Sequence, residues 1–232
     1  MTAHGGDSDH QSPIYPKIPT PPPLLRFGST FRMHIAILTF QGFNELDSLI
    51  ALGVLNRIKK PGWRVTLCCP EPEVTSMNGV TVRAQSSLEE AASAEAVIVG
   101  SGIKTREVVE APELLSRIKL NPERQLIAAQ CSGTLILAKL GLVAGVPACT
   151  DLTTKPWVQE AGVEVLNQPF FAKGNVATAG GCFASPYLAA WIIARTEGEE
   201  AASSALHYVA PVGEKDTYVT NAMKNILPYL PR

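Results

Sequence analysis

The middle of the chain contains the stretch LIAAQCSGTLILA at residues 126–138, in which an apolar run leads into Cys131 and a second apolar run follows. Ala129 and Gly133 stand two residues on either side of the cysteine, and a sharp strand-to-helix turn needs small residues there because larger side chains would collide across it. The following helix directs its first amides at the sulfur, so we expect a lowered thiol pKa and a strong nucleophile. A buried structural cysteine is the alternative interpretation.

Strand and helix patterns alternate on both sides of this stretch. Apolar runs predict strands at 34–40, 65–69, 80–84 and 96–99, and a turn and strand at 174–181. Helical spacing appears at 47–58, around 114–118, and at 185–193, 199–208 and 217–227, with Ser185-Pro186 as N-cap and first position of its helix. The pattern predicts an α/β fold with a mostly parallel sheet covered by helices on both faces. Residues at the carboxyl ends of its strands should meet in one crevice.

Composition restricts the class of protein. The chain has 232 residues, 46% of them hydrophobic, and a formal net charge of −1 from 20 basic and 21 acidic residues without a long run of one sign. This balance argues against a nucleic-acid or membrane-surface partner and favours a small-molecule substrate. No apolar stretch reaches the roughly 18 residues of a membrane span and no signal-peptide core is present, so we expect a cytoplasmic protein. Five cysteines without a Cys-x-x-Cys pair argue against a disulfide framework and a zinc knuckle.

The N-terminal region differs in composition from the rest. Residues 1–32 hold six prolines among Gly, Ser, Thr and His without apolar periodicity, which predicts a disordered or extended tail. Residues 33–232 are predicted as a single domain. Met33 opens its first strand, so a start codon there would leave the domain whole.

The chain resembles the ThiJ/PfpI superfamily, which is related to the class I glutamine amidotransferases, over about residues 33–210. Within the superfamily it is most similar to the isonitrile hydratase branch. The motifs that carry the resemblance are Leu46-Asp47, the segments 131–135, 138–145 and 175–181, and Tyr208-Val209-Ala210-Pro211. The resemblance implies a flavodoxin-like three-layer sandwich with a nucleophile elbow, a homodimer, and a reaction that requires no metal or organic cofactor.

The resemblance also places Asp47 beside the cysteine as its acid partner. A carboxyl group close to a thiolate is expected to have a raised pKa and so to exchange a proton near neutral pH. A carboxylate placed for the helix dipole is the alternative, and it applies equally to Glu45. Many superfamily members have a histidine where this chain has Asp151, so no Cys–His pair can be drawn. Asp151 is a second acid, an acceptor that orders water, or a helix N-cap.

Further candidates follow two other predicted strands. Gly100, Ser101 and Gly102 resemble the oxyanion region of the superfamily, where small residues let backbone amides approach a developing negative charge. Ser132 offers another amide and a hydroxyl for the substrate. The glycine spacing does not fit a dinucleotide loop, so NAD is not expected. Cys182 lies at another strand-to-helix transition and is the rival nucleophile.

Several other residues have no assigned chemistry. His34 and His207 are interpreted as structural, and the role of Cys149 is left open. Cys68 and Cys69 are expected as one core and one surface residue, because side chains alternate along a strand. Five aromatic residues are either pocket lining or core, namely Phe43, Trp157, Phe170, Phe171 and Phe183.

The predicted function is hydration of an isonitrile to an N-substituted formamide. The Cys131 thiolate attacks the terminal carbon while Asp47 donates a proton, which gives a thioimidate, and Asp47 or Asp151 then activates water. One alternative is another cysteine-dependent hydrolase, or a glyoxalase or deglycase that acts on reactive carbonyls. A second alternative is a non-catalytic sensor in which Cys131 is oxidised to a sulfinate.

Overall fold

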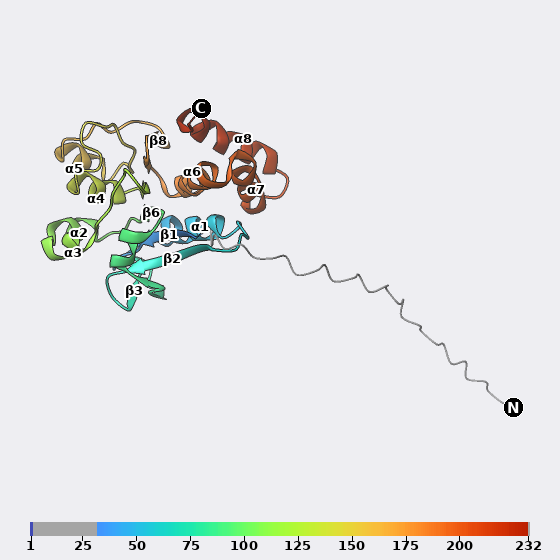
Figure 1. Ribbon diagram of the computed structural model, residues 1–232, viewed down its shortest axis with the longest axis horizontal. Coiled ribbons are helices and arrows are strands. Elements are labelled where there is room, and N and C mark those ends of the chain that lie inside the picture. Colours follow the sequence, from blue (N-terminus) through green and yellow to red (C-terminus); the bar gives the residue numbers. More distant parts are fainter. Residues whose placement is uncertain (2–31, 232) are drawn as a thin grey trace, which may run out of the picture. The chain divides into compact units, whose positions relative to one another are not determined.

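A seven-stranded sheet forms the centre of the fold (Figure 1). The structure is a computed structural model that describes Met1 and residues 32–231. The tail predicted at residues 1–32 lies outside this part of the chain, apart from its two end residues. The contacts between Cα atoms group Phe31–Arg232 into one compact unit.

Six of the seven strands run parallel. In sequence order the strands are β1 (Met33–Leu38), β2 (Trp63–Cys69), β5 (Ser86–Ser87), β6 (Ala96–Val99), β7 (Leu126–Gln130), β8 (Phe170–Lys173) and β9 (Val176–Ala179). Their order in the sheet is β5-β2-β1-β6-β7-β9-β8. Only β8 runs antiparallel, at one edge beside β9. Two further strands, β3 (Glu73–Thr75) and β4 (Thr81–Arg83), form a separate antiparallel hairpin.

Helices cover both faces of the sheet (Figure 1). One face carries α1 (Glu45–Leu55), α6 (Ser185–Glu197), α7 (Glu199–Val209) and α8 (Lys215–Ile226). The other carries α2 (Thr105–Glu110), α3 (Pro112–Arg117), α4 (Gly133–Lys139) and α5 (Lys155–Glu160). Short 3-10 turns are η1 (Leu88–Ser93), η2 (Cys182–Ala184) and η3 (Leu227–Tyr229). These layers confirm the predicted flavodoxin-like sandwich. None of the helices in residues 32–231 is both long and apolar enough to cross a membrane.

The strands bury both of their faces, as the sequence of β1 illustrates. Ile35 and Ile37 pack into one core and Ala36 and Leu38 into the other, and all four side chains are fully buried. An apolar run without polar alternation is typical of such a strand. The expectation that either Cys68 or Cys69 lies on the surface is wrong, because the helices on each face bury both of them.

Three local features differ from the prediction. The segment 80–84 is a strand only at 81–83, and it pairs in the hairpin instead of joining the sheet. Helices α2 and α5 and strands β3, β5 and β8 were not predicted, because each is too short to show a clear period. Ser185 is the first residue of α6 and Ala184 is its N-cap, so Ser185 is not the N-cap. The Ser185 hydroxyl does not cap α6 and can form a hydrogen bond with another residue.

Candidate active site

Cys131 occupies a strained elbow between β7 and α4. Its φ is 45°, and among the described residues it is the only non-glycine residue with a positive φ. Its amide donates a 2.8 Å hydrogen bond to the carbonyl of Ala179, and its carbonyl accepts one of 2.8 Å from the Thr150 hydroxyl. A backbone in this region persists only where its surroundings fix it. The turn therefore holds the sulfur in one position at the carboxyl end of the sheet.

Gly133 allows this elbow to form. A Cβ atom on Gly133 would lie 2.4 Å from the Val99 carbonyl oxygen and 2.9 Å from that of Gly100. Only glycine fits so close to two backbone oxygens. The close approach brings the start of α4 against the end of β6, where the segment 100–102 begins.

Asp47 lies near the start of α1 and is almost fully enclosed. Its side chain is 1% exposed, and the Ser101 hydroxyl donates a hydrogen bond to Oδ2. The other oxygen, Oδ1, is buried without a hydrogen-bond partner among the described residues. The Ser185 hydroxyl fixes the backbone by donating a 2.7 Å hydrogen bond to the Asp47 carbonyl. Burial raises the pKa of the Asp47 carboxyl, which is the expected direction.

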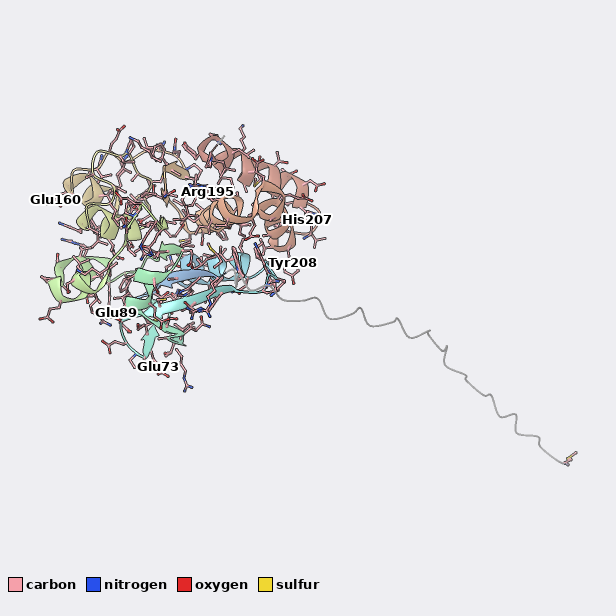
Figure 2. All side chains as sticks on the ribbon, viewed as in Figure 1. Glu73, Glu89, Glu160, Arg195, His207 and Tyr208 are labelled. Atoms are coloured by element: carbon pink, nitrogen blue, oxygen red, sulfur yellow. The ribbon has the colours of Figure 1, made fainter. Side chains whose placement is uncertain are left out.

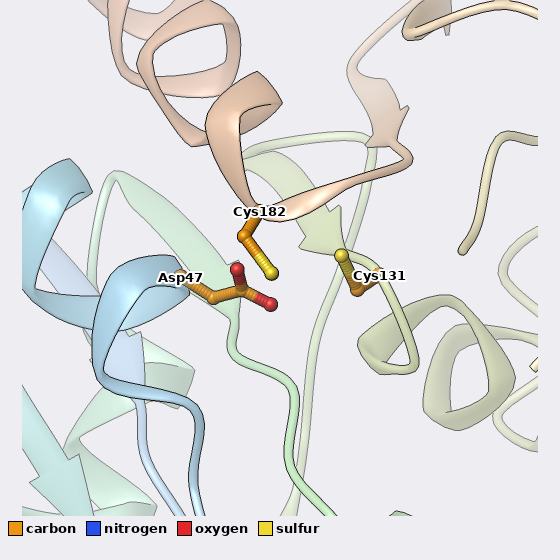
Figure 3. Close-up of side chains that lie close together, drawn as sticks. All are labelled: Asp47, Cys131 and Cys182. Carbon is orange, nitrogen blue, oxygen red and sulfur yellow. The ribbon is translucent and has the colours of Figure 1, made fainter. Parts of the chain in front are cut away.

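Asp47, Cys131 and Cys182 form a cluster from three separate segments. One carboxylate oxygen and the two sulfur atoms lie within 4.8 Å of one another. Figure 3 shows the three side chains pointing into a shared space, from α1, from the elbow and from the turn before α6. The Asn44 side-chain amide donates a 3.2 Å hydrogen bond to the sulfur of Cys182. The structure therefore brings the rival cysteine to the same site as the predicted nucleophile.

The surroundings of Cys131 change the expected state of its thiol. Burial and the adjacent Asp47 carboxylate raise the pKa of the Cys131 thiol, whereas the sequence predicted a lowered one. The cysteine rests as a thiol beside a carboxyl group of raised pKa. A proton therefore has to move before the sulfur can act as a nucleophile.

A cavity of about 390 Å³ opens in front of the two sulfur atoms. Its apolar wall is formed by Met77, Ile103 and Trp157. The Arg106 guanidinium lies over the Trp157 ring at 4.9 Å from its centroid, which fixes the indole. A cavity of this size with an apolar wall suits a small organic molecule.

Trp157 is the one predicted lining aromatic that lines this cavity. Phe43 and Phe170 are buried in the core, and Phe171 packs edge-on against Tyr229. Phe183 is 78% exposed. The aromatic residues were therefore mostly structural, while the apolar Met77 and Ile103 were missed because they lie in turns without a periodic pattern.

Two backbone amides remain available to a bound molecule. The Gly100 amide donates to the Leu38 carbonyl at 3.0 Å, and the Gly102 amide donates to the Ser132 hydroxyl at 3.2 Å. The Ser132 hydroxyl also lies 2.7 Å from the Thr105 hydroxyl, so it is occupied within the protein. By contrast, the amides of Ser101 and Ser132 have no acceptor among residues 32–231. Both residues line the cavity.

Asp151 lies on the cavity wall in a capping position. Its Oδ1 accepts 2.9 Å hydrogen bonds from the amides of Thr153 and Thr154, ahead of α5. Its charge is a minor cause of the raised pKa values of Asp47 and Cys131. This geometry supports the capping interpretation of Asp151, and its role as a second acid stays a prediction.

Glu45 points away from the site. Its carboxylate accepts hydrogen bonds from the Ser76 hydroxyl and, at 2.9 Å, from the Asn78 side-chain amide, both in the turn of the β3–β4 hairpin. These hydrogen bonds lower the pKa of Glu45. Of the two acidic residues in the first turn of α1, only Asp47 faces the cysteine.

No histidine lines the cavity in the described part of the chain. His34 lies at the amino end of β1, where its Nε2 is 2.7 Å from the Thr66 hydroxyl. His207 is exposed on α7, at the periphery of the molecule (Figure 2). Cys149 is fully buried outside the cavity, and burial raises the pKa of its thiol to about 12. None of these three residues lines the cavity.

Asn44 is a residue of this site that the sequence analysis did not single out, although a sequence pattern pointed to one of its two contacts. Asn44 precedes α1 and caps it by accepting a hydrogen bond from the Leu46 amide, and an asparagine before a helix is a recognisable N-cap. Its second contact, with Cys182, joins residues 138 positions apart. Spacing along the chain cannot reveal a contact of that kind.

Comparison with known proteins gives the family. The model of the DJ-1/PfpI family matches residues 33–195. Schizosaccharomyces pombe DJ-1 is similar in structure, with a TM-score of 0.66 and 15% identity over 77% of this chain and 100% of that chain. Drosophila melanogaster DJ-1beta has a TM-score of 0.66 and 21% identity over 77% and 98% of the two chains. A ThiJ/PfpI family protein from Pseudomonas syringae has a TM-score of 0.68 and 16% identity over 88% and 94%. No curated protein sequence matches this chain significantly.

Proposed function

The chain belongs to the DJ-1/PfpI family, and from that premise we propose that it is a cofactor-independent hydro-lyase that adds water to an isonitrile. The product is an N-substituted formamide. Cys131 is the nucleophile and Asp47 is the general acid and base. The family resemblance to the isonitrile hydratase branch and the chemistry of the cluster both support this assignment.

One observation carries the proposal. A buried carboxyl group lies within 4.8 Å of the Cys131 sulfur, and no histidine lines the cavity in the described part of the chain. Acyl transfer by a cysteine normally uses a histidine that is oriented by a third group. Isonitrile hydration needs only a group that first takes a proton and then returns it. A single carboxyl group with a raised pKa can do both.

In the first step the Asp47 carboxylate takes the proton of the Cys131 thiol as the sulfur attacks the terminal isonitrile carbon. A carbon–sulfur bond forms, and Asp47 returns the proton to the same carbon. The result is a thioimidate, in which the carbon is double-bonded to nitrogen. The isonitrile carbon accepts both the sulfur and the proton, so no group leaves, and the carboxylate is regenerated.

In the second step water adds to the thioimidate carbon. Asp47 takes a proton from water and passes it to the nitrogen, which gives a tetrahedral carbon bearing oxygen, nitrogen and sulfur. The carbon–sulfur bond then breaks, the oxygen loses its proton to Asp47, and the sulfur recovers it. We assign to the new oxygen, as it develops negative charge, the amides of Ser101 and Ser132, which have no acceptor within residues 32–231.

The cavity favours a compact apolar side group on the substrate. Met77, Ile103 and Trp157 offer apolar surface, and no cationic side chain belongs to the described lining. An alkyl or aryl isonitrile therefore fits better than one with a charged tail.

The test is conversion of cyclohexyl and phenyl isonitrile to their formamides by purified protein, followed by chromatography. We expect repeated turnover, and a loss of about 10²- to 10⁴-fold in rate for Asp47→Asn, which is the usual contribution of a general acid–base. Cys131→Ala should abolish turnover. Cys149→Ala, which removes a thiol outside the cavity, is the matched control. Failure of the unmodified chain to form formamide would overturn the proposal.

A thiol oxidation sensor is the second candidate, and the raised pKa of Asp47 favours it. A protonated Asp47 could donate a hydrogen bond to an oxygen on oxidised Cys131. A peroxide-dependent mass increase on Cys131 without formamide production would select this function. Consumption of a dicarbonyl compound would select a glyoxalase or deglycase instead.

A further inference from the structure

We propose that Asp47, Cys131 and Cys182 form a three-ligand site for a thiophilic divalent cation such as Zn²⁺, and that the bound cation blocks the nucleophile. The claim that a cation binds here is argued from the geometry alone. The claim that the cation inhibits the enzyme also rests on the proposed function.

The ligand atoms are close enough to share one ion. Zinc in proteins bonds to cysteine sulfur at about 2.3 Å and to carboxylate oxygen at about 2.0–2.2 Å, with tetrahedral geometry. Such bonds place two sulfur atoms roughly 3.8 Å apart and a sulfur and an oxygen roughly 3.5 Å apart. The three atoms already lie within 4.8 Å of one another, so an adjustment of about 1.3 Å or less brings them to bonding distance.

A second observation points to a ligand at this place. Oδ1 of Asp47 is buried without a hydrogen-bond partner, in a side chain that is 1% exposed. Figure 3 shows the Asp47 carboxylate facing both sulfur atoms. The other oxygen is held by the Ser101 hydroxyl, which orients the carboxylate. A bound cation would satisfy the unpartnered oxygen.

The surroundings suit a metal-bound thiolate and leave one position open. The Asn44 amide donates to the Cys182 sulfur at 3.2 Å, and a hydrogen bond of this kind stabilises a metal-bound ligand. Both sulfur atoms line the 390 Å³ cavity. A cation held by three protein ligands would keep its fourth position toward that cavity, as in open zinc sites.

Two sulfur ligands and one oxygen ligand favour zinc-like cations over magnesium or calcium. Thiolates are soft ligands that select zinc and similar ions, whereas Mg²⁺ and Ca²⁺ take oxygen ligands. When the cation is bound, the charge of the Cys131 thiolate is shared with the metal and the Asp47 carboxylate is occupied as a ligand, so the sulfur is a weaker nucleophile and its base is not available. The cation would therefore act as an inhibitor of the hydratase.

The test is titration of the full chain with Cd²⁺ as a spectroscopic probe, in the presence of a phosphine reductant that keeps the thiols reduced. We expect one Cd²⁺ per chain, with a thiolate-to-cadmium absorption band, and displacement by Zn²⁺. Cys182→Ser and Asp47→Asn should each weaken binding by more than about 100-fold, because losing only a group that hydrogen-bonds a ligand costs about 10- to 100-fold. Cys69→Ala, which removes a buried thiol elsewhere, should bind as the unmodified chain does.

Equal Cd²⁺ affinity in the unmodified chain and Cys182→Ser would overturn the site, as would the absence of the thiolate band. Thermal unfolding of each variant checks that it is folded. Cd²⁺ binding is measured without turnover. If the chain binds Cd²⁺ but makes no formamide, the result supports the metal site and contradicts the proposed function. If saturating Zn²⁺ leaves formamide production unchanged, the claim that the cation inhibits the enzyme is wrong.

Discussion

Cys131 and Asp47 are two acids enclosed in the same buried space, and the negative charge of Asp47 raises the pKa of the Cys131 thiol. Burial is the main cause of the raised pKa of both groups. A second negative charge in that space is unfavourable, so the thiol keeps its proton while Asp47 is ionised. This explains how a cysteine without a histidine partner can still transfer protons in a reaction.

The pH dependence of turnover follows from the state of Asp47. The first step needs the carboxylate form, so kcat/KM should fall as pH falls through the raised pKa of Asp47. The fall should lie above the usual aspartate value of about 3.9. Rates are measured by formamide production, and Cys131→Ala supplies the uncatalysed rate at each pH. A profile that stays flat down to the ordinary aspartate range would contradict the assignment of Asp47 as the base.

The same group makes stability depend on pH. Because the pKa of Asp47 is higher in the folded chain, the folded state binds its proton more tightly than the unfolded state. The stability due to this group is therefore complete below about pH 4 and is lost as pH rises to the raised pKa. Asp47→Asn removes the titration, so its free energy of unfolding relative to the unmodified chain should increase over this window. Urea denaturation at several pH values measures it, and a constant difference would refute the prediction.

At the scale of the elements, the elbow between β7 and α4 depends on Gly133. The steric effect of a substitution there can be distinguished from the general effect of replacing glycine by alanine in a helix. In Gly133→Ala the new Cβ meets the carbonyl oxygens of Val99 and Gly100 at 2.4 and 2.9 Å. We expect a destabilisation of about 1–3 kcal/mol, the usual cost of overpacking, and loss of turnover. The matched control is Gly53→Ala in α1, where a Cβ meets nothing within 4 Å. That variant should be more stable by about 0.5–1 kcal/mol, and urea denaturation of both tests the contrast.

The elements show how far the sequence could predict the fold and the site. The elbow was predictable because Ala129, Cys131 and Gly133 are local, and their small size is needed within one turn. Asp47 required the family resemblance, since Glu45 in the same turn fits a dipole role equally well. The edge strand β8 was not predicted, because four residues are too few to show a periodic pattern. Cys182 was predicted only as a rival nucleophile, and its position beside Asp47 depends on the packing of distant elements.

At the scale of the whole molecule, the parallel sheet explains why these residues meet. The segments after β6, β7 and β9 all leave the sheet at its carboxyl end, and they supply Ser101, Cys131 and Cys182. Neighbouring parallel strands place their carboxyl ends at one edge, which is where such folds bind ligands. The thiol pKa was predicted in the wrong direction because the enclosure of Cys131 is produced by the assembled layers.

The domain boundary at residue 33 stays a prediction, and the structure suggests how to test it. Met33 opens β1 in register with Trp63, and its amide donates a 3.0 Å hydrogen bond to the Gly62 carbonyl. A chain that begins at Met33 keeps these contacts, so it should unfold at the same temperature and turn over at the same rate as the full chain. Thermal unfolding and formamide production measure this. A clear loss of either would place part of the domain within residues 1–32.

The homodimer implied by the family resemblance is also a prediction for the whole molecule. Sedimentation velocity of the full chain should give a single species of about twice the 24.8 kDa chain mass. A monomer at all concentrations would contradict it.

The most direct test of the account is to find the atom that bonds to the substrate. The chain is mixed with an isonitrile, quenched in acid during turnover, and examined by intact mass and peptide mapping. We predict a mass increase of one isonitrile on Cys131, absent in Cys131→Ala. An adduct on Cys182, or formamide production without any adduct on Cys131, would contradict the assignment of Cys131 as the nucleophile.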